Sequence, residues 1–280
     1  MIVPINIGAN KIDANKIEIN IDIITMCQLK CPYCYSRYDK RKWGKIMKLN
    51  DFKKIVQLIS NLNGDIRVSL LGGEPTLHPL LNVFLKLLYK TKNVSEVDIY
   101  TNGEKDLRNL LLDEKLTINY TYHSTETSDD NIFRNIDNLK FKNTVVTTTI
   151  TKKTKDEAIS FYNKCKVRGV FFEPTYITSN KTKKSSFIST NAEIDNFKVI
   201  DINGEKLSIK DIYERDLFNF KGHKCFNNSY TIYVNLECFK ECPNKRYNNL
   251  NEMFKEIAYR SYICPYERCD NLCMVECKKD

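Results

Sequence analysis

Short apolar runs that fit β-strands alternate along the first 176 residues with segments of helical periodicity. Residues 17–23 (IEINIDI) carry isoleucine at every second position, as in a strand with one buried face. Residues 50–62 then gather their apolar side chains on one face of a helix, at Phe52, Ile55, Val56, Ile59 and Leu62. The chain is therefore expected to begin with a strand followed by a helix.

The alternation of strand and helix continues beyond this first unit. Further strands are expected at 66–73, 97–103, 116–124, 144–150 and 169–174. Helices are expected at 78–90 with Pro79 in the first turn, at 104–112, at 129–139, and after the capping-box pair Thr154 and Glu157. Six such units predict an α/β fold, a partial (β/α)6 TIM-like barrel with a parallel sheet covered by helices.

Composition divides the chain into three parts. Residues 1–177 form the expected barrel. Residues 178–221 are expected to be a linker or insert, because their first half is rich in Ser, Thr, Asn and Lys, with a hairpin-like stretch at 197–209. Residues 222–280 are expected to form a small cysteine-rich domain.

Length and apolar content indicate a soluble protein. The 280 residues are 42% apolar, enough for one substantial core and a small appendage. The longest apolar stretches have the length of a strand, and the N-terminal residues lack the basic flank and apolar segment of a signal peptide. A cytoplasmic location without membrane attachment is the expectation.

The chain is moderately basic. Lys and Arg total 44 against 35 for Asp and Glu, which gives a net charge of +9. Such an excess could favour an acidic peptide, a phosphorylated substrate or nucleic acid. It is spread along the chain without an arginine-rich run or an aromatic-basic motif, so most of it is interpreted as solvated surface and nucleic acid is not an expected partner.

Eleven cysteines dominate the candidate chemistry. A reducing compartment disfavours disulfides and an odd count leaves one thiol unpaired, so the clustering indicates metal. Cys27, Cys31 and Cys34 follow the first strand at the spacing C-x3-C-x2-C, with no fourth Cys or His nearby. Structural zinc normally has four protein ligands, whereas three thiolates leave one iron of a four-iron cluster open. Zinc, or a cluster with a remote fourth ligand, remains the alternative.

A second motif, LLGGEP at residues 70–75, falls at the end of the second predicted strand. Chemistry in such folds lies at the carboxyl ends of the strands, where TNG (101–103) and HSTE (123–126) also fall. Glycines permit close backbone approach, and Glu74 can accept a hydrogen bond from an ammonium group. An ordinary βα turn is the alternative interpretation, as is a simple Asn-Gly turn for TNG.

Over about residues 15–175 the chain resembles the radical S-adenosylmethionine (radical SAM) enzymes, on the three-cysteine spacing and the Gly-Gly-Glu-Pro segment. The resemblance implies a [4Fe-4S] cluster whose open iron chelates SAM, one-electron cleavage of SAM to a 5′-deoxyadenosyl radical, and hydrogen abstraction from a substrate. An external donor such as flavodoxin or ferredoxin would supply the electron. Gln28 departs from the family, where Asn is more usual.

The resemblance also suggests which residues contact SAM. The Gly-Gly-Glu segment would bind the methionine amino group, Tyr33 would lie near adenine, and Ser124 would contact the ribose or carboxylate. His123 and Glu173 are further candidates for SAM or substrate. The expected cofactor-binding residues are Tyr33, Gly72, Gly73, Glu74, Asn102 and Ser124.

The cysteine-rich tail partly resembles the SPASM and twitch extensions of radical SAM enzymes, which hold auxiliary iron-sulfur clusters. Cys264, Cys273 and Cys277 fit the SPASM frame, whereas Cys269 stands two positions late. One auxiliary [4Fe-4S] cluster is expected and a second is possible; a zinc ribbon is the alternative. The expected ligands are Cys225, Cys242, Cys264, Cys269, Cys273 and Cys277. Cys165 lies on a helical face with Ala158 and is expected to be a core thiol.

The expected function is a radical SAM enzyme that modifies a ribosomally made peptide or a protein side chain by crosslinking, epimerisation or oxidation. A dehydrogenase or epimerase of a small molecule such as a sugar or alcohol is the first alternative. A noncatalytic zinc or iron-sulfur module that binds nucleic acid is an alternative of a different class.

Overall fold

The computed structural model describes most of the barrel and short pieces of the remaining chain. The described residues are 16–31, 34, 44–150, 154–176, 198–200, 206–208, 224–225, 228–240, 245–257, 262–263 and 277–278.

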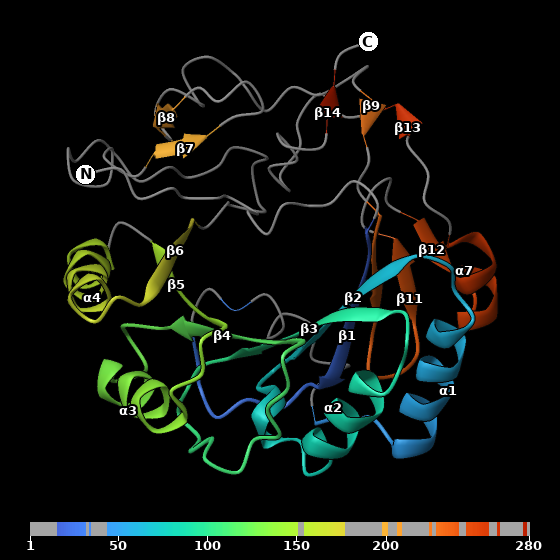
Figure 1. Ribbon diagram of the computed structural model, residues 1–280, viewed down its shortest axis with the longest axis horizontal. Helices are drawn as coiled ribbons and strands as arrows, with labels where there is room; N and C mark the ends of the chain where they lie inside the picture. The colour runs from blue at the N-terminus through green and yellow to red at the C-terminus, as the bar shows by residue number, and fades with distance from the viewer. Residues whose placement is uncertain are drawn as a thin grey trace.

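Six parallel strands form most of the main sheet (Figure 1). They lie side by side in chain order, with each strand hydrogen-bonded to the next. Their positions confirm the predicted strands and the α/β fold class. The strands are β1 (Lys16–Ile24), β2 (Asp65–Gly72), β3 (Val94–Thr101), β4 (Leu116–Tyr122), β5 (Thr144–Ile150) and β6 (Phe171–Tyr176).

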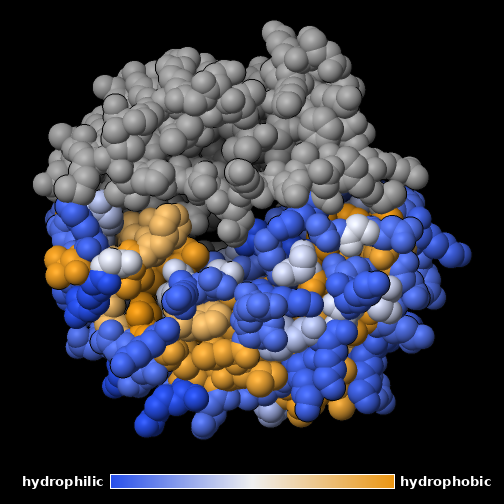
Figure 2. Space-filling view, viewed as in Figure 1, coloured by the Kyte–Doolittle hydropathy of each residue, from blue (hydrophilic) through white to orange (hydrophobic). Residues whose placement is uncertain are grey.

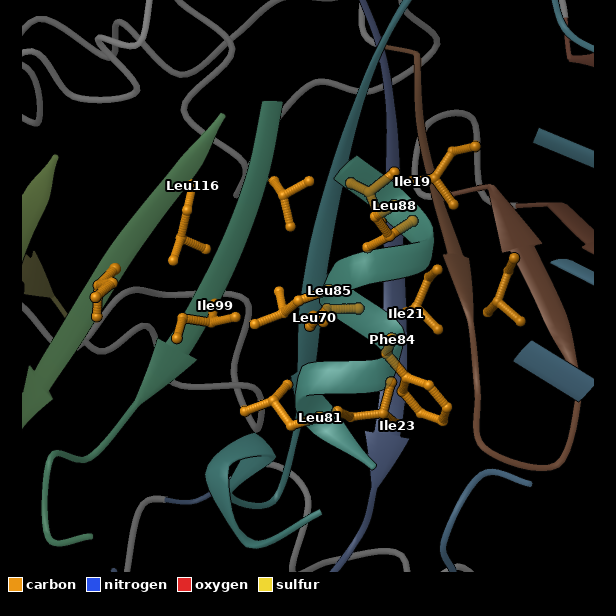
Figure 3. Packing of buried hydrophobic residues seen from close by; sticks show 14 of the residues in the cluster. Ile19, Ile21, Ile23, Leu70, Leu81, Phe84, Leu85, Leu88, Ile99 and Leu116 are labelled. Atoms are coloured by element: carbon orange, nitrogen blue, oxygen red, sulfur yellow. The ribbon is translucent and has the colours of Figure 1, made fainter. Parts of the chain in front are cut away.

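Helices cover one face of this sheet, as the apolar periodicity predicts. They are α1 (Leu49–Ser60), α2 (Leu81–Tyr89), α3 (Asp129–Leu139) and α4 (Lys155–Val167). In β1 every second side chain is buried, and Ile19, Ile21 and Ile23 have no exposed surface. Figure 3 shows these three isoleucines packed toward α2. Burial of each such side chain stabilises the fold by about 1.5 to 3 kcal/mol, so this layer holds the helices on the sheet.

The opposite face of the sheet is polar. The Arg67 guanidinium contacts the Asp98 carboxylate at 2.5 Å, and Asn119 donates to the same carboxylate at 3.1 Å. The Asp98 side chain is only 2% exposed, so its charge is stabilised by these partners and not by water. The inner wall of the partial barrel is therefore a hydrogen-bonded polar layer.

The prediction of a helix at 104–112 is wrong, because the chain between β3 and β4 forms turns instead. Its backbone groups are satisfied by side chains of neighbouring helices. Asn135 of α3 accepts from Leu107 N–H at 2.9 Å, and Asn82 of α2 accepts from Leu111 N–H at 2.9 Å. These bonds replace the internal hydrogen bonds that a helix would need.

Two helix starts also differ in detail from the expectation. Pro79 lies before α2 begins at Leu81, after a short 3-10 helix, η3 (Pro75–Leu77), and is not in the first turn of α2. Thr154 is the N-cap residue of α4, as predicted, but its side chain makes no capping hydrogen bond. Cys165 is fully buried in the core beside Phe161 and Ala158, which confirms its predicted role.

Part of the cysteine-rich segment continues the barrel's sheet across the predicted division at residue 222. Strand β10 (Ser229–Ile232) pairs parallel to β1, and β11 (Cys238–Lys240) and β12 (Lys245–Tyr247) add antiparallel strands beyond it. Helix α7 (Leu250–Glu256) packs against α1. Among the described strands β12 and β6 lie at the two edges, so the sheet is open.

Further short strands lie outside this sheet. The predicted hairpin at 197–209 is confirmed, since β7 (Lys198–Ile200) pairs antiparallel with β8 (Lys206–Ser208). A second small sheet consists of β9 (Lys224–Cys225) between β13 (Tyr262–Ile263) and β14 (Cys277–Lys278).

On the described surface, hydrophilic residues surround smaller apolar areas (Figure 2). Val83, Leu111 and Leu112 are among the exposed large apolar side chains. Of the helices described, none combines the length and the apolar character that crossing a bilayer requires.

Candidate active site

The cysteine loop leaves the sheet at the carboxyl end of β1, and its base is closed by backbone hydrogen bonds. Thr25 N–H donates to the Lys45 carbonyl at 3.0 Å, and Met47 N–H donates to the Ile23 carbonyl at 2.8 Å. The chain entering the loop and the chain leaving it are thus held together, so the loop projects from a fixed position at this edge.

Gly72 and Gly73 pack their backbone directly on the entrance of the cysteine loop. The N–H groups of Gly73 and Glu74 donate to the carbonyls of Ile24 and Met26 at 2.7 and 2.8 Å. A Cβ on Gly72 would lie 2.0 Å from the Ile24 carbonyl oxygen, and one on Gly73 would lie 2.2 Å from that of Met26. Only glycine fits this approach, and the backbone that it approaches is the base of the cysteine loop.

The Glu74 carboxylate joins the ends of β2 and β3. Its side chain is buried, and Oε1 accepts from Thr76 N–H at 3.0 Å, Thr76 Oγ1 at 2.6 Å and Thr101 Oγ1 at 2.8 Å, while Oε2 accepts from Asn102 N–H at 2.7 Å. Burial raises the pKa of Glu74, and these four donors oppose that shift. Each carboxylate oxygen offers about two lone-pair sites, so Oε1, with three donors, is fully used, whereas Oε2, with one donor, keeps acceptor capacity.

Asn102 links the TNG turn to the cysteine loop. Its Oδ1 accepts from Gln28 Nε2 at 3.0 Å and from Glu104 N–H at 3.1 Å, and its Nδ2 lies 3.7 Å from Cys27 Sγ, within hydrogen-bonding range for sulfur. Gly103 adopts φ +73°, a left-handed conformation that favours glycine. Asn102 therefore makes hydrogen bonds both within its own turn and to the cysteine loop.

The three cysteines of the loop are free thiols. Cys31 is buried, whereas Cys27 and Cys34 are half-buried, and Cys34 N–H donates to the Cys31 carbonyl at 3.1 Å. Leu29 N–H donates to Cys27 Sγ at 3.4 Å. Burial raises the pKa of Cys27 and raises that of Cys31 to about 11, with the nearby charge of Glu126 as the next cause for Cys31. Metal binding must therefore displace protons from these thiols.

The donor set fits an iron-sulfur cluster. The three thiols belong to one loop. The Leu29 backbone N–H and the Asn102 side-chain NH2 group both donate to Cys27 Sγ, and such hydrogen bonds are usual for thiolates that hold a cluster. In the described part of the chain, no three His, Cys, Asp or Glu side chains are gathered tightly enough to ligate a single metal ion. A four-iron cluster instead binds each thiolate through a different iron, so its ligands lie farther apart.

The turn after β4 also reaches the cysteine loop. Glu126 Oε2 accepts from Lys30 N–H at 3.1 Å. Burial lowers the pKa of His123 to about 4, so its imidazole is neutral at physiological pH. Ser124 is half-buried in the same turn, at the edge where the sequence places it.

Sequence reasoning did not single out Gln28 and Glu126 as site residues. Both act through contacts between loops that are about 74 and 96 residues apart in the chain. The only signal available was their position, within the cysteine loop and within the HSTE segment at a strand end.

The described tail brings two of the predicted auxiliary ligands together. Cys225 of β9 pairs in register with Cys277 of β14 and, on the other side, with Tyr262 of β13. Cys238, by contrast, is buried in β11 and donates through Sγ to the Leu236 carbonyl at 3.1 Å, so it is a core thiol. Five predicted site residues lie outside the described part of the chain: Tyr33, Cys242, Cys264, Cys269 and Cys273.

Comparison with known proteins gives a family match over most of the barrel. The model of the Radical SAM superfamily matches residues 21–173. PqqA peptide cyclase of Bradyrhizobium diazoefficiens is 29% identical over 86 residues, which are 31% of this chain and 21% of that protein. The 7-carboxy-7-deazaguanine synthase of Clostridium acetobutylicum is 28% identical over 159 residues, 54% of this chain and 69% of that protein. The match thus spans only about a fifth of the peptide cyclase.

Two solved structures share the fold. The anSMEcpe structure with bound AdoMet and Cp18Cys peptide has a TM-score of 0.53 at 17% identity, over 80% of this chain and 73% of that chain. Streptococcus suis SuiB bound to precursor peptide SuiA has a TM-score of 0.54 at 17% identity, over 80% of this chain and 59% of that chain. At these identities the likeness concerns the fold, and it agrees with a partial TIM-like barrel.

Proposed function

The chain belongs to the radical SAM superfamily of enzymes, and from this premise we propose that it abstracts hydrogen from a ribosomally made peptide or a protein side chain. Superfamily membership implies a [4Fe-4S] cluster and SAM as cofactors. The reaction would be a crosslink, an epimerisation or an oxidation.

One observation carries this proposal: the loop with Cys27, Cys31 and Cys34 is seated on Gly72 and Gly73 at the carboxyl edge of the parallel sheet. When bound, a cluster on these thiolates supplies one electron to SAM, which yields methionine and a 5′-deoxyadenosyl radical. The protein's part is to fix the geometry and to exclude competing reactions. The closed loop base provides the fixed geometry.

Glu74 is proposed to contact the SAM ammonium through Oε2, the oxygen that accepts a single hydrogen bond from the described residues. Its other oxygen is committed to Thr76 and Thr101. Tyr33 and Ser124 remain the proposed contacts for adenine and for ribose or carboxylate.

The proposed substrate class rests on likeness and on charge. PqqA peptide cyclase has a peptide in its name, and the two solved structures contain bound peptides. The net charge of +9 suits an acidic peptide. A small-molecule substrate is the second candidate, because GTP 3′,8-cyclase of Chlorobaculum tepidum is 28% identical over 98 residues.

We propose that the tail holds one auxiliary [4Fe-4S] cluster. The in-register pairing of Cys225 with Cys277 supports it, since two predicted ligands share one small sheet. The remaining proposed ligands are Cys242, Cys264, Cys269 and Cys273. Free thiols suit a reducing compartment, so the proposed location is the cytoplasm. The proposed electron donor is a flavodoxin or ferredoxin.

The test is anaerobic incubation of the reconstituted protein with SAM, a strong reductant and candidate substrates, followed by mass spectrometry. A crosslink or oxidation removes two hydrogens from the peptide, whereas an epimerisation in heavy water replaces one hydrogen by deuterium. Conversion of small molecules with every peptide unchanged would favour the second candidate. Absence of 5′-deoxyadenosine with every substrate would contradict the proposed function.

A further inference from the structure

The Asn102 side chain is held in one orientation by hydrogen bonds from two separate parts of the chain. The Glu104 backbone N–H donates to Oδ1 at 3.1 Å, and Gln28 Nε2 donates to the same oxygen at 3.0 Å. A backbone N–H can only donate, so the atom facing Glu104 must be the amide oxygen. The amide NH2 group is therefore directed to the other side, where Cys27 Sγ lies 3.7 Å away.

The backbone of Asn102 is fixed as firmly as its side chain. Its N–H donates to the buried Glu74 carboxylate at 2.7 Å, and the residue is only 4% exposed. Glu74 in turn donates its own N–H to the Met26 carbonyl, one residue before Cys27. Asn102 and the first cysteine are thus held against each other by the same short network.

We propose that Asn102 tunes the reduction potential of the cluster by donating an N–H···S hydrogen bond to the Cys27 ligand, and that Gln28 holds the Asn102 amide in the donating orientation. This inference rests on the proposed function, because it concerns the cluster on the three-cysteine loop. Asn102 acts here through a cluster ligand, which makes it a positioning residue.

The direction of the effect follows from charge. One-electron reduction by an external reductant adds negative charge to the cluster and its thiolates. A donor N–H at sulfur stabilises that added charge, and hydrogen bonds to the sulfurs are among the features that set cluster potentials. Loss of the Asn102 donor is therefore expected to make the cluster harder to reduce. Cys27 Sγ also accepts from Leu29 N–H at 3.4 Å, so within the described part of the chain Asn102 supplies the side-chain donor and Leu29 the backbone donor.

The test is a redox titration followed by electron paramagnetic resonance, read on the signal that changes when SAM is added. Asn102→Ala removes the donor without adding charge, and at a given potential the ratio of reduced to oxidised cluster is expected to fall about tenfold, equivalent to about 59 mV for one electron. Asn102→Asp keeps the acceptor for Glu104 and Gln28, loses the donor and adds a charge, so its shift is expected to be larger. Gln28→Ala is expected to shift the potential in the same direction and by less.

Asn143→Asp is the matched control. Asn143 is exposed beside the start of β5, at the opposite end of the sheet, and makes a hydrogen bond to the Glu114 carbonyl. It undergoes the same amide-to-carboxylate change, and the potential is expected to stay that of the parent.

The outcomes separate the inference from the proposed function. An unchanged potential in an Asn102→Ala variant that holds the parent's iron would overturn the inference alone. A shifted potential in a protein whose parent cannot cleave SAM would overturn the proposed function alone, and a parent without a cluster would overturn both. If Asn102→Ala fails to fold, Gln28→Ala decides, because Gln28 is exposed and its replacement removes its hydrogen bond to Asn102 while leaving the buried contacts of Glu74 intact. An unshifted potential in that variant would then overturn the inference.

Discussion

Replacing Glu74 by Gln tests whether this carboxylate holds the candidate active site together. The Gln side chain keeps one acceptor oxygen and replaces the other by an NH2 group that can only donate. The less costly orientation places that NH2 group at the Oε2 position, where it meets Asn102 N–H. The other orientation would turn it toward the three donors from Thr76 and Thr101. In the less costly orientation one buried, charge-assisted hydrogen bond is lost.

The expected cost follows from that single bond. A hydrogen bond to a charged group contributes about 1.5 to 3 kcal/mol, so the free energy of unfolding is expected to fall by about that amount. The same substitution removes the proposed partner of the SAM ammonium. A loss of similar size there corresponds to a roughly ten- to hundredfold weaker affinity for SAM.

Both quantities can be measured on one preparation. Equilibrium urea unfolding gives the stability, and anaerobic calorimetry at the same pH gives the SAM affinity. Glu114→Gln, at an exposed position, is the matched control and is expected to match the parent in both. If Glu74→Gln unfolds with the same free energy as the parent, the stabilising role of the hydrogen bonds to Glu74 is refuted. If the folded variant binds SAM with the same affinity as the parent, Glu74 only connects the turns after β2 and β3.

Three further predictions concern the glycine turn, the β4 edge and the tail. Gly73→Ala would bring a Cβ 2.2 Å from the Met26 carbonyl oxygen, so about 1 to 3 kcal/mol of stability and much of the iron uptake are expected to be lost. Burial lowers the pKa of His123 to about 4, so between pH 6.5 and 4 its imidazole is protonated in the unfolded chain and neutral in the folded one. The free energy of unfolding is therefore expected to fall as the pH drops through this range, by about 3 kcal/mol at pH 4. His123→Gln is expected to remove this pH dependence. The pair Cys264→Ala and Cys269→Ala is expected to lower iron from about eight to about four per chain while SAM is still cleaved.

Each of these predictions has a contrary outcome. Gly73→Ala with the parent's iron content would mean that the loop base tolerates a side chain. Equal pH slopes for the parent and His123→Gln would assign the acid sensitivity to other groups. Four irons plus stoichiometric zinc in the parent would make the tail a structural zinc site.

The strands were predictable because burial on one face leaves a period of two in the sequence, as in Ile19, Ile21 and Ile23 of β1. Helix α3 was predictable as well, since Ser128 accepts from Asp130 N–H at its start and its apolar residues recur with helical spacing. The absent helix at 104–112 could not be foreseen. Backbone N–H groups of this segment donate to the side chains of Asn82 and Asn135, and the local sequence does not predict these tertiary contacts.

The candidate site divides in the same way. Spacing within the chain marked the three cysteines and the glycine turn, because ligands on one loop and a glycine requirement are local features. The partners of Asn102 and the four donors to Glu74 depend on which loops meet at the sheet edge, and that is decided by strand order. The sequence therefore indicated the chemistry more readily than the network that positions it.

The most direct test of the account is SAM cleavage by the reconstituted chain under anaerobic reduction, with 5′-deoxyadenosine and iron quantified together. The parent is expected to form 5′-deoxyadenosine, and the triple variant Cys27→Ala, Cys31→Ala and Cys34→Ala is expected to form none. Cys165→Ala, which removes a buried core thiol from α4, is the control and should cleave SAM as the parent does. Equal cleavage by the parent and the triple variant would contradict the assignment of radical chemistry to this loop.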